Sequence, residues 1–99
     1  MARVGWRRYA RSMPLVTLRA PLKDLAGGNR DLQLDGETVG AVLRALEATW
    51  PKTAGWILDE HGAVRRHVNV FRNGEQVDEA TALLADDHLQ VLPSITGGT

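Results

Sequence analysis

The sequence of 99 residues contains no cysteine, and phenylalanine and tyrosine occur once each. Without cysteine the chain has no disulfide, no zinc–thiolate site, no cysteine nucleophile and no thiol that could carry sulfur. No run approaches the ~18 consecutive apolar residues of a membrane-spanning helix. We therefore expect a soluble, cytoplasmic protein of one domain, with no membrane partner and with any sulfur chemistry on another atom.

Net charge is also absent, since 12 Lys and Arg balance 12 Asp and Glu. The balance is uneven along the chain, because four arginines and no acid lie in residues 1–12 (Arg3, Arg7, Arg8 and Arg11). The rest of the chain is acidic, which argues against nucleic acid as a partner. We predict that residues 1–13 form a disordered basic extension; a basic arm or a targeting peptide is the alternative.

Apolar periodicity predicts two strands and one long helix in the first half of the chain. Strands are expected over 16–20 and 32–35, where apolar and polar residues alternate, with a loop over 23–29 between them. Thr38 is a good N-cap, and the apolar residues that follow have helical spacing up to Trp50. Pro51 then ends a helix over 38–49.

The second half predicts a β-hairpin and a final strand. Alternation over 67–71 leads into Asn73-Gly74, a strong type I′ turn signal, and the chain should return through Gln76-Val77. We expect a short helix within 52–65, a helical turn over 80–85, a bend at Asp86-Asp87 and a strand over 88–93.

This order predicts an α+β fold of the β-grasp (ubiquitin-like) type, with a mixed sheet of four to five strands and one main helix. The predicted domain covers residues 14–94, and residues 95–99 form a flexible tail. The core should consist of the helix stripe (Val39, Val42, Leu43, Leu46, Trp50) and the inner strand residues (Val16, Leu18, Leu32, Leu34, Val68, Val70, Leu89, Val91).

Three segments resemble the ubiquitin-like sulfur carriers of the ThiS/MoaD type: residues 36–39 before the helix, residues 68–77 around the hairpin, and the ending Leu92-Pro93-Ser94-Ile95-Thr96-Gly97-Gly98. The likeness covers about residues 14–98 and is greatest to carriers that supply cysteine biosynthesis. Asp86 stands where the family usually has glycine, a position that favours left-handed backbone.

The resemblance implies a protein co-substrate and not an enzyme. A ThiF/MoeB-like enzyme would adenylate the Gly98 carboxylate with ATP, and a sulfide equivalent would convert it to a thiocarboxylate. Gly97 lacks a Cβ, so the tail could thread a narrow channel. Thr99 follows the diglycine and would have to be removed, as by the zinc-dependent peptidases of related carriers. The sulfur acceptor would be a synthase, such as a PLP-dependent cysteine synthase, a thiazole synthase or the large subunit of molybdopterin synthase.

Strand alternation also predicts a docking patch beside the tail. If the inner residues face the helix, Phe71 and Leu92 point outward as an exposed apolar pair on neighbouring strands. We predict that this pair, with Pro93 and Ile95, binds the activating enzyme and that Arg72 orients the approach.

Two other functions remain open at this point: a ubiquitin-like modifier joined to target lysines through Gly98, and a noncovalent β-grasp interaction domain. His61, His67 and His88 lack metal-ligand spacing, so no metal or bound cofactor is expected.

Overall fold

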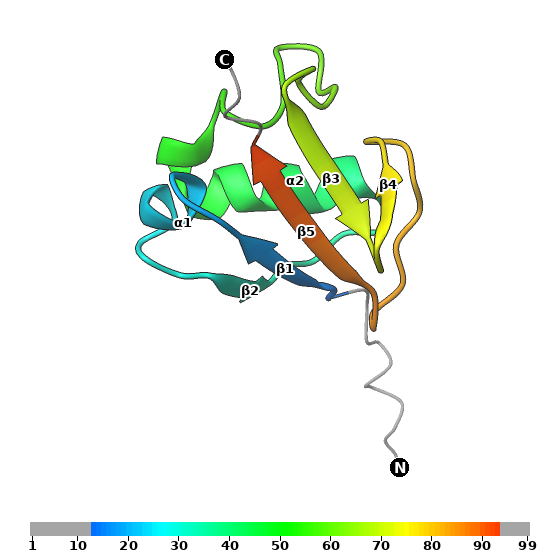
Figure 1. Cartoon of the computed structure of the whole chain (residues 1–99). Helices are drawn as coiled ribbons and strands as arrows, with labels where there is room; N and C mark the ends of the chain where they lie inside the picture. The colour runs from blue at the N-terminus through cyan, green and yellow to red at the C-terminus, as the bar shows by residue number, and fades with distance from the viewer. Residues whose placement is uncertain (1–12, 94–99) are drawn as a thin grey trace.

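The computed structural model describes residues 13–93 as a five-stranded sheet with one main helix packed on one face (Figure 1). The elements in chain order are β1 (Leu15–Leu18), α1 (Leu22–Leu25), β2 (Asp31–Gln33), α2 (Val39–Thr49), the 3-10 turn η2 (Pro51–Thr53), β3 (Val68–Arg72), β4 (Glu75–Val77) and β5 (His88–Pro93). The α+β, β-grasp fold expected from the sequence is confirmed.

The last strand of the chain lies in the middle of the sheet, whose order is β2-β1-β5-β3-β4. β5 runs parallel to β1, with Val16 opposite Leu89, and antiparallel to β3, with Val70 opposite Val91. The two hairpins, β1–β2 and β3–β4, therefore lie on either side of β5 and hold it through two ladders of hydrogen bonds (Figure 1).

Helix α2 begins and ends as its sequence predicts. The Thr38 hydroxyl accepts a hydrogen bond from the Ala41 amide at 3.1 Å, which satisfies one of the free donors of the first turn. Trp50 leaves helical geometry at φ −127° and ψ 82°, directly before Pro51. The four residues Val39, Val42, Leu43 and Leu46 are buried and face the sheet.

The core is larger than the sequence predicts. Every predicted core residue except Leu32 and Trp50 is buried, and those two are half-buried and pack against the core. Five further hydrophobic residues are buried: Leu22, Ala26, Ile57, Leu58 and Leu83. All five come from connecting segments in which no two-residue alternation marks an inner face.

The predicted loop over 23–29 is wrong at its start, because residues Leu22–Leu25 form the short helix α1. Leu22 and Ala26 are fully buried and Leu25 packs against the core, so these three residues form one apolar face at helical spacing. The amide of Ala26 completes the turn on the Leu22 carbonyl at 3.0 Å.

The predicted helical turn over 80–85 is also wrong. Residues 81–83 instead pair with the start of α2 through an antiparallel bridge between Thr38 and Ala82. The Val39 amide donates to the Thr81 carbonyl at 2.9 Å, and the Leu83 amide donates to the Glu37 carbonyl at 2.9 Å. These bonds satisfy backbone groups on both segments, and buried Leu83 reaches the core.

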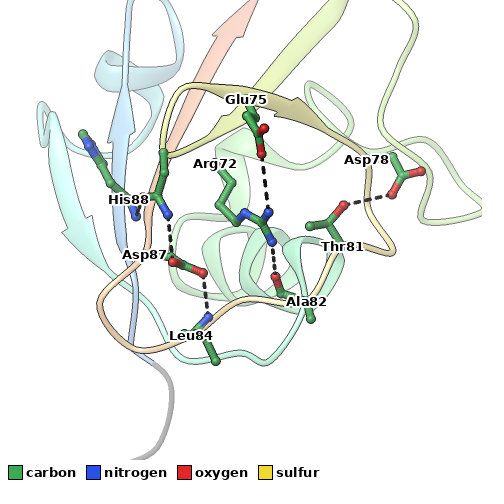
Figure 2. A network of polar contacts seen from close by, with 9 residues as sticks. Arg72, Glu75, Asp78, Thr81, Ala82, Leu84, Asp87 and His88 are labelled. Carbon is green, nitrogen blue, oxygen red and sulfur yellow. Dashed lines mark hydrogen bonds and ion pairs between the residues drawn. The ribbon is translucent and has the colours of Figure 1, made fainter.

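The bend before β5 forms without left-handed backbone at Asp86. Within residues 13–93 Asn73 is the one non-glycine residue with positive φ, 51°, and Gly74 follows at φ 90°, as the predicted type I′ turn requires. Asp87 holds the bend instead, since its carboxylate accepts a hydrogen bond from the Leu84 amide at 2.8 Å (Figure 2).

No helix within residues 13–93 has the length and apolar character needed to cross a membrane.

Candidate functional site

The root of the C-terminal tail is the end of β5, the strand held on both sides. Val68 of β3 lies opposite Pro93, and Leu18 of β1 lies opposite Val91. Ile95, Gly97, Gly98 and Thr99 lie outside the described residues. The fold thus fixes where the tail begins, on a strand that cannot shift without breaking two ladders.

Phe71 and Leu92 lie on the sheet face opposite α2, as predicted. In the register Phe71 faces Gln90 and Leu92 faces Asn69, so the two apolar residues are diagonal neighbours. Neither is fully exposed, and the predicted exposed pair is instead half-buried. We call Phe71 and Leu92 the tail-root patch. Pro93, which the sequence analysis predicts to join them, lies opposite the buried Val68 and therefore on the α2 face.

Arg72 does not belong to the tail-root patch. It follows Phe71 in β3 and therefore points to the other face of the sheet, at the end of β3 that lies beside Leu89. Its Nη1 donates to the Ala82 carbonyl at 3.1 Å, and its Nη2 lies 3.7 Å from Glu75 Oε1 (Figure 2). Arg72 holds the segment before β5 in place.

A polar chain occupies the outer face of the sheet next to the tail-root patch. His88 Nε2 lies 2.6 Å from the Thr17 hydroxyl, which donates to Asp31 Oδ1 at 2.8 Å. A carboxylate only accepts hydrogen bonds, so the Thr17 hydroxyl points its proton at Asp31. The Thr17 oxygen then accepts a hydrogen bond from His88. This order does not activate the hydroxyl as a nucleophile, because His88 is a donor here and not a base.

This chain of hydrogen bonds lines a shallow hollow of about 490 Å³ whose margins carry Arg19 and Arg30. The Thr17 hydroxyl is the main cause that lowers the pKa of Asp31 below its usual value, and the Arg30 guanidinium contributes to the shift. Alternation places Thr17 and His88 on the outer face, but the parallel register that brings them together is not visible in the sequence.

The three histidines do not form a metal site. Across residues 13–93 no group of three His, Asp or Glu side chains is close enough to hold a metal ion. The described residues form a folded domain with the tail-root patch near the end of its central strand.

Comparison with known proteins agrees with this geometry. The ThiS family model matches residues 16–98, nearly the whole chain up to the second terminal glycine. The chain belongs to the ThiS family. ThiS-family sulfur carriers are not enzymes; they are carriers that E1-like enzymes activate.

Relatives of two kinds resemble this ThiS-family chain. Small archaeal modifier protein 3 of Haloferax volcanii is 44% identical over 68 residues, which cover 65% of this chain and 73% of the relative. Sulfur carrier protein CysO of Mycobacterium tuberculosis is 33% identical over 91 residues, covering 84% and 98%. The crystal structure of SAMP1 from Haloferax volcanii has a TM-score of 0.78 at 32% identity and covers 88% of this chain and 100% of that one.

Proposed function

We propose that this ThiS-family protein carries sulfur as a thiocarboxylate on Gly98. The observation that carries the proposal is the position of the Gly97-Gly98 ending, which follows shortly after the central strand β5 in a chain without cysteine. We therefore assign the thiocarboxylate to the backbone carboxyl group of Gly98. A relative of similar length, CysO, is named a sulfur carrier, which supports the same reading.

The chemistry proceeds in two steps. The Gly98 carboxylate attacks the α-phosphorus of ATP on an E1-like, ThiF/MoeB-type enzyme, giving an acyl-adenylate and pyrophosphate. A sulfide equivalent then attacks the carbonyl carbon, AMP leaves, and the thiocarboxylate remains. The final acceptor is a synthase, for which a PLP-dependent cysteine synthase is our first candidate.

Thr99 must leave before activation, because a Gly98 in peptide linkage has no free carboxylate. We assign the removal to a peptidase, with a zinc-dependent enzyme as the first candidate. The match to the family ends at Gly98 and leaves Thr99 outside, which supports this step.

The tail-root patch, extended by Ile95, is the proposed docking surface for the activating enzyme. Leu92 lies on β5, the strand that precedes the tail, and Phe71 lies on its antiparallel neighbour β3. An enzyme bound to both residues would hold the tail at a fixed distance from its ATP site. Arg72 and Pro93, which lie on the opposite face, are left out of this surface.

The deciding experiment uses chains that end at Gly98 and at Thr99, each incubated with an E1-like partner, ATP and sulfide and analysed by intact-mass spectrometry. The chain ending at Gly98 should gain the mass difference between oxygen and sulfur, while the chain ending at Thr99 should stay unchanged. A Gly98-ended chain that forms neither an adenylate nor a thiocarboxylate would falsify the proposal.

The likeness to small archaeal modifier protein 3 favours a second function, conjugation of Gly98 to lysines of other proteins. Both functions share the acyl-adenylate and differ in the nucleophile, sulfide or a lysine amine. Trypsin digestion of cell extract and a search for lysines that carry residues 73–98 as a branch separates them, because Arg72 is the last basic residue before Gly98. A noncovalent interaction domain would instead keep its function after deletion of residues 97–99.

A further inference from the structure

Exposed apolar residues occur at the end of the sheet opposite the tail root. Four large apolar residues within residues 13–93 are exposed, and three of them belong to this end: Met13 before β1, Leu15 as its first residue and Leu84 shortly before β5. The Leu15 amide donates to the Asp87 carbonyl at 3.2 Å, and the Leu84 amide donates to the Asp87 carboxylate at 2.8 Å. Leu84 is 67% exposed, on a segment fixed by this bond. We call these three residues the Leu84 surface.

Carboxylates lie close to the Leu84 surface. Asp86 adjoins it in sequence, and Glu37 lies beside it because the Leu83 amide donates to the Glu37 carbonyl at 2.9 Å. Asp35 follows Leu34, whose amide donates to the Pro14 carbonyl at 3.3 Å. Arg72 already interacts with Glu75 and the Ala82 carbonyl (Figure 2). Arg30, which lines one hollow with Leu15, interacts with Asp31, and Arg19 lies past the far end of β1. An apolar centre with an acidic margin fits a segment that is both basic and aromatic.

The chain itself contains such a segment, and it joins the domain at the Leu84 surface. Residues 1–12 carry four arginines and no acid, and they include Trp6 and Tyr9. Twelve extended residues span about 40 Å, more than enough to fold back from Met13 to Leu84. A tether this short gives an effective concentration of the order of mM, so a weak contact is sufficient.

We propose that residues 1–12 bind the Leu84 surface of the same chain. Trp6 and Tyr9 cover Leu84 and Leu15, and the arginines lie beside Asp86 and Glu37. This contact is independent of the proposed sulfur chemistry, because the tail leaves β5 at the opposite end of the strand (Figure 1).

The absence of cysteine makes a direct test possible in the full chain. An Ala2→Cys variant carries a single nitroxide spin label, and paramagnetic broadening of backbone amide signals is measured by NMR at low protein concentration. We expect strong broadening at residues 84–87 and at Leu15, and little at residues 91–93. Leu84→Ser should reduce the broadening several-fold, while Trp56→Ser, which removes an exposed apolar side chain elsewhere, should leave it unchanged.

Three results would overturn the proposal: no broadening at residues 84–87, broadening spread evenly over the domain, or broadening that Leu84→Ser does not reduce. A second copy of the chain could also occupy the surface. This case is tested with a mixture of two proteins, one with the spin label and no ¹⁵N and the other with ¹⁵N and no spin label. Broadening of comparable strength in that mixture would mean that a second copy occupies the surface, and the intramolecular assignment would be wrong.

Discussion

The Asp87 carboxylate accepts a hydrogen bond from the Asn73 side chain at 2.9 Å, and this contact joins the turn of the β3–β4 hairpin to the start of β5. Asn73 returns the interaction, because its Oδ1 accepts from the His88 amide at 2.9 Å. Asn73, which the sequence predicts as a turn residue, thus also aligns β5.

We predict that Asp87 stabilises the protein most above its own pKa. The Leu84 amide and the Asn73 side chain lower the pKa of this carboxyl below its usual value. A lowered native pKa gives stability that is present above the unfolded value, about 3.9, and is lost as pH falls through the native pKa. Urea unfolding of wild type between pH 7 and pH 2 should show this loss, and Asp87→Asn should flatten it. An unchanged acid profile in the variant would contradict the prediction.

Gly36→Ala should destabilise the fold by about 1–3 kcal/mol. A Cβ at Gly36 would lie 2.7 Å from both the backbone nitrogen and Cγ2 of Val42, where the first turn of α2 cannot move away. Gly28→Ala is the control, because a Cβ there meets no atom within 4 Å and only the left-handed φ of 84° opposes it. Thermal unfolding should rank the Gly36 variant below the Gly28 variant, and the reverse order would refute the steric argument.

Leu43→Ala should lower the free energy of unfolding by about 2–5 kcal/mol, because Leu43 is fully buried on the face of α2 that packs on the sheet. Glu47→Ala, one turn further along the same helix and not part of the buried core, should change the free energy of unfolding by less than about 0.5 kcal/mol. Chemical denaturation of the three proteins measures both effects. Equal midpoints for Leu43→Ala and wild type would contradict the packing described for the core.

Phe71→Asp and Leu92→Asp should each reduce adenylation of a Gly98-ended chain at least tenfold while the domain stays folded. A charge placed on the tail-root patch opposes burial against an enzyme. Gln33→Asp adds the same charge on the same sheet face at the edge strand β2 and should leave adenylation unchanged. Pyrophosphate release measures the rate and circular dichroism the fold. Normal rates in both patch variants would remove this surface from the proposed function.

Sequence periodicity predicts the parts of this fold whose partners are local. Helix α2, with its Thr38 cap and its end at Trp50, and the Asn73-Gly74 hairpin depend on residues a few positions apart. The path of residues 81–83 depends instead on backbone groups of Glu37 and Val39, more than 40 positions away in the chain. Local propensity carries no signal for such a contact.

The candidate site divides in the same way. Alternation correctly assigns Phe71 and Leu92 to the outer face, and the same alternation places Arg72 on the inner one. The half-buried state of the pair and the chain from His88 through Thr17 to Asp31 depend on the strand order and register, which alternation does not determine.

The central position of β5 has a consequence for protein synthesis. Of the five strands of the sheet, β5 leaves the ribosome after the other four, yet both hairpins need it as their common neighbour. A nascent chain that stops before β5 has two hairpins without their common neighbour, and such an incompletely folded chain is degraded readily. A folded domain therefore means that translation has passed β5, and chains truncated before that strand would not compete for the proposed activating enzyme.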